Sequence, residues 1–188
     1  MLISLTGPSG IGKGHIKKHL LRVFPELREV VWLTTRPLRQ DETTNQSNRE
    51  HVTHQEFQSL VEQDEVLFVQ RLYGHCYGLR KSGLWSAADG YWMVEFHIEN
   101  LLEAKKTGLN MFAVGMVPDG LAILADRLTT RGGEDTDNIR QRLEASCEEI
   151  NQIQLNRHLF DEVFTVSAEN QHMICAVVSH VIGRQMKR

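Results

Sequence analysis

The stretch Gly7-Pro8-Ser9-Gly10-Ile11-Gly12-Lys13-Gly14 constrains this chain more than any other. It follows an apolar run at residues 2–6, and residues 14–24 after it predict a helix. A strand, a glycine-rich turn and a helix in this order are typical of a phosphate-binding loop. The glycines let successive backbone N–H groups point at a phosphate, and the helix N-terminus adds partial positive charge. We therefore predict that this loop binds nucleotide phosphates and that Lys13 reaches the β- and γ-phosphates.

One position in the loop departs from the usual pattern. A Ser or Thr normally follows the loop lysine, and its hydroxyl ligates Mg²⁺. Here the position is Gly14, which has no side chain. Either other groups hold the metal through water, or catalysis is weakened or lost.

The order of the apolar segments predicts the fold class. A chain of 188 residues can bury a full core without disulfides, so we expect a single domain. Further strands are predicted at residues 30–33, 91–94, 110–116 and 164–166, and helices at about 98–106, from Pro118 past Leu128, at about 136–157 and at about 169–184. Alternating strands and helices predict a three-layer α/β fold with a parallel sheet. In such a sheet the ligand lies beyond the carboxyl ends of the strands.

Residues 36–89 have a different pattern and predict a small insert in a core formed by residues 1–35 and 90–188. Thr53 and Glu56 form a capping box that predicts a helix to about Gln63. A strand at 66–69, a turn with a return strand at 73–78 and a short helix at 82–88 are expected after it. We expect these segments to form a small mixed sheet apart from the main one.

Charged side chains are predicted to gather where the strands end. Arg36 and Arg39 follow the predicted strand at 30–33, and Glu95 ends the one at 91–94. A carboxylate at the end of a central strand commonly helps to organise Mg²⁺ and water, although a plain surface charge is the alternative for Glu95. Arg127 and Arg131 are four residues apart and therefore lie on one helical face.

Composition excludes several classes of partner. A net charge of −3 argues against general binding to nucleic acid or to anionic membranes, and no apolar run approaches the ~20 residues that span a bilayer. The three cysteines form no C-x-x-C pair, and the nine histidines show no metal-binding spacing, so we assign no residue to a metal site. With no signal peptide at the N-terminus, we expect a cytoplasmic protein of unspecified oligomeric state.

These residues resemble the guanylate kinase family. Gly7 to Lys13 resemble its phosphate loop, and Tyr77-Gly78 resembles its YG pair. The remaining similar motifs are Thr34-Thr35-Arg36 with Arg39 and Glu42 (TTR-x-x-R-x-x-E), Arg127-Leu128-x-x-Arg131-Gly132 and Ile139-x-x-Arg142-Leu143. The resemblance runs in register along most of the chain and implies the same P-loop kinase fold.

The resemblance also implies an activity, the transfer of the γ-phosphate of ATP to GMP with Mg²⁺ as cofactor. Arg36, Arg39 and Tyr77 would hold the acceptor phosphate within the insert, and Glu95 would lie beside it. Arg127, Arg131 and Arg142 would close over ATP as a helical lid at about 127–142. Arginines suit this task because two dense anions have to meet and guanidinium groups match phosphate oxygens.

The resemblance fails around the acceptor base. Leu33 stands where the family has a serine, Arg49 near its first tyrosine, Phe68 at the glutamate that pairs with guanine, and Leu79 at a serine or threonine. A pocket without hydrogen-bond partners for guanine should lose strong discrimination. His97, just past Glu95, is a candidate replacement donor.

Three functions therefore remain open. The first is a guanylate-kinase-like enzyme with a divergent pocket for GMP or another phosphorylated small molecule. The second resembles ribose 1,5-bisphosphate phosphokinase, which also lacks a Ser or Thr after the loop lysine, although Arg39 fits a nucleotide phosphate better. The third is a catalytically silent binding module, which Gly14 favours and Lys13 disfavours.

Overall fold

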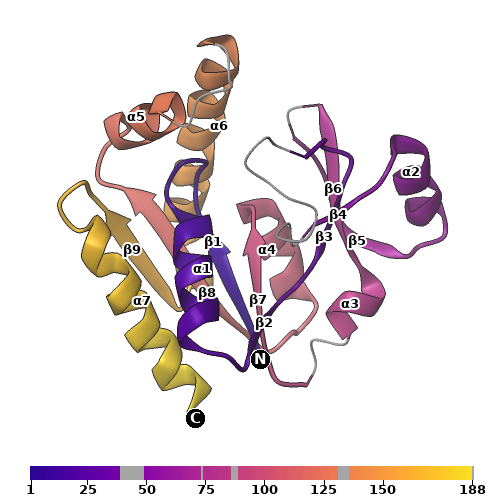
Figure 1. The fold of residues 1–188 in the computed structure, drawn as a ribbon, viewed down its shortest axis with the longest axis horizontal. Helices are drawn as coiled ribbons and strands as arrows, with labels where there is room; N and C mark the ends of the chain where they lie inside the picture. Colours follow the sequence, from indigo (N-terminus) through magenta and orange to yellow (C-terminus); the bar gives the residue numbers. More distant parts are fainter. Residues whose placement is uncertain (39–48, 73, 86–88, 131–135, 188) are drawn as a thin grey trace.

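A computed structural model describes residues 1–38, 49–72, 74–85, 89–130 and 136–187 of the chain (Figure 1). Its larger sheet has five parallel strands in the order β2-β7-β1-β8-β9. These strands are β1 (Leu2–Thr6), β2 (Leu27–Glu29), β7 (Tyr91–Phe96), β8 (Met111–Pro118) and β9 (Glu162–Val166). The central strand β1 is buried along its whole length, as expected for a parallel strand covered on both faces.

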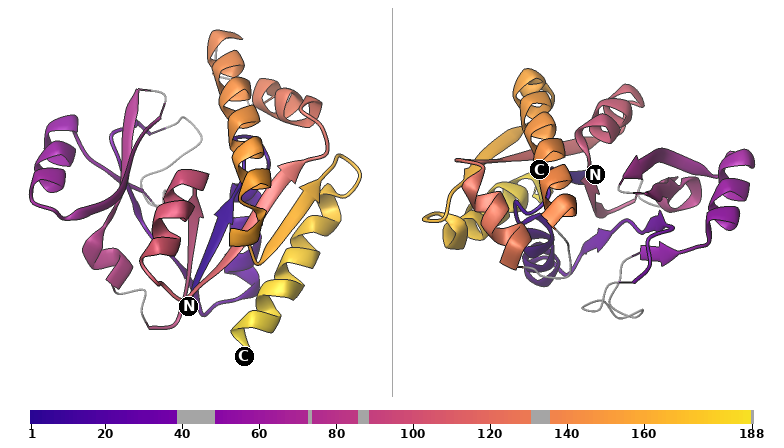
Figure 2. Two further views of the ribbon diagram at one scale, coloured as in Figure 1. Left: turned by 180° about the vertical axis from the view of Figure 1, so that it is seen from behind. Right: turned by 90° about the horizontal axis from the view of Figure 1, so that it is seen from above.

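Helices cover both faces of this sheet, which confirms the predicted three-layer α/β fold. On one face α1 and α7 pack against β1 and β8, where Ile16, Leu20 and Val178 join a buried cluster. On the other face α4 and α6 contribute Leu101 and Ile153 to a second cluster (Figure 2). The helices outside the smaller sheet are α1 (Lys13–Val23), α4 (Ile98–Lys106), α5 (Ala122–Thr130), α6 (Thr136–Leu155), α7 (Gln171–Met186) and the short 3-10 helix η2 (Arg157–Leu159). No helix of the described residues is long and apolar enough to span a membrane.

The smaller sheet has four strands in the order β4-β3-β6-β5 and is mixed, as predicted. Its strands are β3 (Trp32–Thr34), β4 (Arg49–His51), β5 (Val66–Leu72) and β6 (His75–Arg80). Helix α2 (His54–Glu62) covers one face, where Phe57 packs on Leu33 and Val66. Helix α3 (Lys81–Trp85) follows β6, and residues 86–88 of the predicted helix lie outside the described residues.

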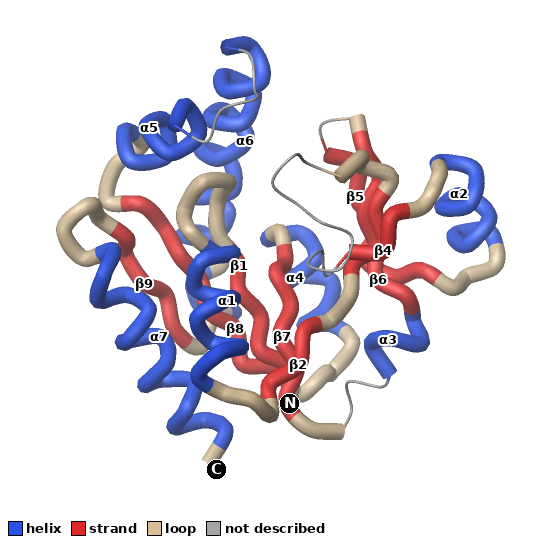
Figure 3. The backbone as a smooth tube through the Cα atoms, viewed as in Figure 1, coloured by secondary structure: helices blue, strands red, loops and turns tan. Residues whose placement is uncertain are grey.

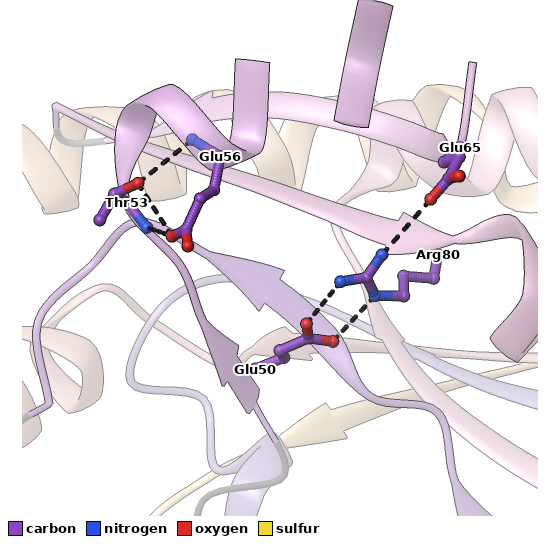
Figure 4. A network of polar contacts seen from close by, with 5 residues as sticks. All are labelled: Glu50, Thr53, Glu56, Glu65 and Arg80. Atoms are coloured by element: carbon purple, nitrogen blue, oxygen red, sulfur yellow. Dashed lines mark hydrogen bonds and ion pairs between the residues drawn. The ribbon is translucent and has the colours of Figure 1, made fainter. Parts of the chain in front are cut away.

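Polar contacts fix the outer side of the smaller sheet (Figure 4). Arg80 on β6 donates two hydrogen bonds to the Glu50 carboxylate on β4, at 2.9 and 2.6 Å, and lies 3.6 Å from Glu65. The predicted capping box is present at the start of α2, where the Thr53 hydroxyl accepts from the Glu56 N–H and the Glu56 carboxylate accepts from the Thr53 N–H. The Arg80–Glu50 pair thus joins the edge strand β4 to β6, and the capping box fixes the start of α2.

Two predicted boundaries are wrong. The predicted strand at 30–33 is replaced by β2 and β3, which belong to different sheets, because the chain crosses between the sheets within this apolar run. Pro118 does not begin a helix but ends β8, opposite Val166. The N–H of the next residue, Asp119, donates to the carbonyl oxygen of Val166 on β9. The nitrogen of Pro118 therefore points the other way, towards β1. The last residue of β1 pairs with Gly115, so β1 has already ended at the level of Pro118. Proline is tolerated there because no ladder hydrogen bond is lost.

The two sheets place α5 and α6 opposite the smaller sheet. Figure 3 shows the two helices on one side of the carboxyl ends of β1 and β7, and β3 to β6 on the other. Loops that follow the carboxyl ends of these strands therefore meet between the two parts, where a ligand is expected in a parallel α/β sheet.

Candidate active site

A cleft of about 960 Å³ lies between the phosphate loop and the smaller sheet. The predicted site residues that line it are Gly7, Ser9, Gly10, Gly12, Lys13, Gly14, Arg36, Tyr77, Glu95, Arg127 and Arg142. Pro8 contributes to the loop through its backbone, and Ile11 is anchored in the core with 1% of its surface exposed. Arg39 and Arg131 lie outside the described residues. The cleft thus brings together residues from six separate parts of the chain, namely the loop and the segments that carry Arg36, Tyr77, Glu95, Arg127 and Arg142.

The backbone of the loop requires its glycines. Gly10 and Gly12 have φ angles of +83° and +108°, in the left-handed region that favours glycine. At Gly7 a Cβ would lie 2.6 Å from the carbonyl oxygen of Met116 on β8. The turn that follows β1 is therefore compatible only with this pattern of glycines, and it leads directly into the N-terminus of α1. A loop of this shape before a helix N-terminus can direct N–H groups at an anion, and phosphate binding by it stays a prediction.

Lys13 bends back across the loop. Its ammonium group donates hydrogen bonds to the carbonyl oxygens of Gly7 and of Pro8, the latter at 3.1 Å. The positive charge thus lies at the centre of the loop's curve, where nucleotide phosphates would bind.

Two arginines of the α5–α6 pair contact the loop itself. Arg127 donates to the carbonyl oxygens of Gly10 at 3.1 Å and Ile11 at 2.8 Å, and its partial burial lowers the pKa of the guanidinium. Arg142 donates to the hydroxyl of Ser9 at 3.2 Å. Both groups therefore lie beside the predicted phosphate site, and Arg127 also fixes the backbone of the loop.

The position of Gly14 is open. It is exposed at the start of α1, and an added Cβ would meet no atom within 4 Å. No group of three metal-ligating side chains occurs among the described residues, and Glu95 and Glu149 are carboxylates of the cleft wall. With no hydroxyl at residue 14, Mg²⁺ that arrives with ATP would take most of its ligands from phosphates and water.

A charged triad forms the floor of the cleft. Lys17 lies one turn beyond Lys13 on α1, 2.6 Å from Glu29 and 2.7 Å from Glu95. Burial opposes the charge of Lys17, but the two carboxylates raise its pKa above the ordinary value. Burial likewise opposes the charge of Glu95, yet Lys17 and Lys13 lower its pKa overall. Sequence analysis missed Lys17 and Glu29; the only signal was the spacing of four residues between the two lysines.

A second carboxylate, Glu149 on α6, was also missed. It is 7% exposed, and its Oε2 lies 3.7 Å from Nε2 of His97. Burial raises the pKa of Glu149, although Lys13, His97 and the backbone N–H of Ile98 oppose the shift. Arg142, Ser146 and Glu149 are spaced four and three residues apart, so this single helical face lines the cleft.

The opposite wall carries the groups expected to bind the acceptor phosphate. Arg36 is 8% exposed, its N–H donates to the Thr34 hydroxyl at 3.1 Å, and Nδ1 of His51 lies 2.7 Å from its carbonyl oxygen. The guanidinium of Arg49 lies over the ring of Tyr77, 5.8 Å from the ring centre. These contacts hold two arginines and a phenol on the cleft side of the smaller sheet.

Most of the positions at which the resemblance fails do not line the cleft. Among the four positions at which the resemblance fails, only Arg49 lines the cleft. Leu33 faces α2 on the other side of the sheet, and Phe68 and Leu79 are buried in the core. Gln70, which the sequence did not indicate, lines the cleft instead.

Comparisons with known proteins agree with this geometry. The family model described as guanylate kinase matches residues 1–173. The guanylate kinase of Desulfitobacterium hafniense is 31% identical over 152 residues, which are 80% of this chain and 76% of that protein. The guanylate kinase of Syntrophomonas wolfei is 33% identical over 152 residues, 79% of this chain and 76% of its own.

A solved structure shares the fold. The guanylate kinase from Anaplasma phagocytophilum superposes with a TM-score of 0.70 at 17% identity, covering 100% of this chain and 87% of that one. The match to the family model runs from the phosphate loop through the segments that line the cleft. The chain therefore belongs to the guanylate kinase family.

Proposed function

We propose that the protein is an ATP-dependent phosphotransferase that moves the γ-phosphate of ATP to the phosphate of GMP. The observation that carries this proposal is that one cleft joins Lys13 of the phosphate loop to Arg36 of the smaller sheet. A triphosphate on the loop and a phosphate at Arg36 would face each other across it. Membership of the guanylate kinase family supports the choice of GMP.

The side chains of the cleft fit the electrostatic demands of this reaction. Phosphoryl transfer needs little covalent work from the protein, because catalysis consists mainly of placing two anions in line and neutralising their charge. Lys13 and Arg142 supply positive charge on the donor side, and Arg36 and Arg49 supply it on the acceptor side. Arg39 and Arg131 keep their predicted roles in acceptor binding and lid closure.

The phosphate loop and Mg²⁺ would have different roles in the binding of ATP. The glycines and Lys13 would hold the phosphates of ATP, and Arg127 would keep the loop in the shape that does so. Mg²⁺ bound with ATP supplies neutralising charge at the β- and γ-phosphates. Because Gly14 offers no hydroxyl, this chain leaves the metal more dependent on water than a loop with serine would.

The direct test measures ADP release from purified protein with Mg-ATP and a panel of GMP, dGMP, AMP, UMP and ribose 1,5-bisphosphate. We expect turnover with GMP, loss of it in Lys13→Ala, and wild-type rates in Lys106→Ala, which removes an exposed lysine on α4. Turnover only with the sugar phosphate would identify a sugar-phosphate kinase. ATP binding without turnover of any acceptor would identify a silent binding module, and either result contradicts the proposal.

A further inference from the structure

The side-chain amide nitrogen of Gln70 lacks a hydrogen-bond partner among the described residues at the wall of the cleft. The residue is 9% exposed, its Nε2 has no hydrogen-bond partner, and it lines the wall formed by the smaller sheet. A buried donor without a partner is costly, so such a group in a native structure calls for an explanation. Because this donor borders the cleft, a bound ligand is the natural source of its partner.

An irregularity in β5 brings Gln70 to this wall. Leu67 pairs with Leu79 on β6, but Gln70 pairs with Tyr77, so Phe68 and Val69 together lie opposite a single residue. In a regular ladder Val69 would pair with Tyr77, and Gln70 would point to the α2 face. The bulge therefore exchanges an apolar side chain for an amide at this point of the cleft.

The same bulge places Phe68 in an aromatic cluster that reaches the cleft through Trp32 and Phe96. Phe68 has a φ of +54°, an unfavourable conformation for a bulky residue. Its ring packs edge-on to Phe96, with 5.2 Å between ring centres, and Phe96 in turn lies 6.2 Å from Trp32. Strained backbone next to a cleft is a feature of binding sites, and here the cleft is lined both by aromatic residues, Trp32 and Phe96, and by Gln70.

The chemistry of this arrangement matches a nucleobase. A glutamine amide presents an N–H donor beside a carbonyl acceptor, and the complementary partner is a carbonyl beside an N–H on a planar ring. The 6-oxo and N1–H groups of guanine and hypoxanthine form such an edge. Arg36, on the same side of the smaller sheet, would hold the phosphate of the same molecule.

We propose that Gln70 is a specificity-determining residue that hydrogen-bonds the 6-oxo, N1–H edge of a purine nucleoside monophosphate. The inference rests on the proposed kinase function and names the residue that recognises the base of its acceptor, an edge that a sugar phosphate does not offer. Phe68 stands where the family has the glutamate that pairs with guanine. Gln70, two residues further along β5, would supply the missing hydrogen bonds to the base.

The test compares GMP and IMP in wild type, Gln70→Leu and Gln70→Glu. IMP has the same 6-oxo, N1–H edge as GMP but lacks the 2-amino group. In Gln70→Leu we expect kcat/KM to fall by about tenfold to a hundredfold for both acceptors, with the KM of ATP unchanged. In Gln70→Glu the carboxylate can accept from N1–H and from the 2-amino group, so we expect the GMP-to-IMP ratio to rise by about tenfold.

The matched control is Gln58→Leu, the same chemical change on the exposed side of α2, which should behave as wild type. Calorimetric titration of GMP and IMP measures the same contact without turnover. Equal affinities and equal kcat/KM in wild type and Gln70→Leu would overturn the role of Gln70 while leaving the kinase function intact. A wild type that neither binds nor phosphorylates any nucleoside monophosphate would overturn both. Correct folding of each variant is checked by its thermal unfolding.

Discussion

Arg127 on α5 donates a hydrogen bond of 2.8 Å to the carbonyl oxygen of Ile11 in the phosphate loop. The side chain of Ile11 is buried in the core beneath, so this short segment is held from two sides. The loop and α5 are therefore coupled, because the guanidinium of Arg127 helps to fix the shape of the loop.

Replacing Arg127 by Met should weaken ATP binding. The change leaves the carbonyls of Gly10 and Ile11 without this donor, and hydrogen bonds from a charged group contribute about 1.5–3 kcal/mol. We expect the KM of ATP to rise by about tenfold to a hundredfold, with a smaller change in the KM of GMP. Steady-state kinetics check this, with Arg140→Met, an exposed arginine on α6, as the control. An unchanged KM of ATP would show that the contact does not shape the site.

Gly14→Ser should make the enzyme faster and less dependent on magnesium. The position is open to a Cβ, so the serine fits without displacing any atom, and its hydroxyl supplies the ligand that the loop lacks. Gly14→Ala fills the same space without a hydroxyl, and it should only stabilise α1, by about 0.5–1 kcal/mol. The measurement is ADP release against Mg²⁺ concentration. Equal curves for the Ser and Ala variants would mean that other groups already hold the metal.

The sequence predicted the parts of the fold that depend on local pattern. The alternation of strands and helices gave the three layers, and Thr53 with Glu56 gave the start of α2 to the residue. The glycines of the loop could be predicted to form a tight turn, because Gly10 and Gly12 adopt positive φ angles that other residues rarely adopt. These features need no knowledge of distant contacts.

Features that depend on contacts between segments far apart in the sequence were not predictable. Gln70 reaches the cleft only because β5 gains one residue relative to β6, and no local signal marks that register shift. Glu149 and Lys17 become site residues because α6 and α1 pack beside the same cleft. Pro118 was misassigned because its tolerance in β8 depends on where the neighbouring strand β1 ends.

Lys17→Met should destabilise the fold in a pH-dependent way. It removes the cation that Glu29 and Glu95 share in a largely buried place, and breaking such a pair costs about 3 kcal/mol or more. Lys17 and Lys13 lower the pKa of Glu95 overall, so its stabilising contribution is present above the ordinary value of 4.5 and lost as pH falls through the folded-state pKa. The deficit of the variant should therefore be largest near pH 7 and shrink in acid. Urea unfolding at several pH values measures it, and a constant deficit would contradict the assignment.

Glu149→Gln should stabilise the protein, and increasingly so as pH rises. Burial raises the pKa of Glu149 above its ordinary value of 4.5, so the folded state binds this proton more tightly than the unfolded state. The carboxyl group's favourable contribution is then complete below pH 4.5 and is lost as pH rises through the folded-state pKa. Glutamine does not titrate, so the variant avoids that loss. Its advantage should grow by about 1.4 kcal/mol per pH unit between the two pKa values and then level off.

Urea unfolding of wild type and Glu149→Gln from pH 4 to pH 8 measures this difference directly. The neighbouring Glu148 is exposed on the same helix, so Glu148→Gln is the matched control and should follow the wild-type profile. Because glutamine keeps the size and the hydrogen-bonding oxygen of the side chain, packing against His97 and the start of α4 is retained. Parallel profiles for wild type and Glu149→Gln would mean that the carboxylate is charged in the folded state at no cost, and that its burial beside Lys13 is fully compensated by the cations of the cleft.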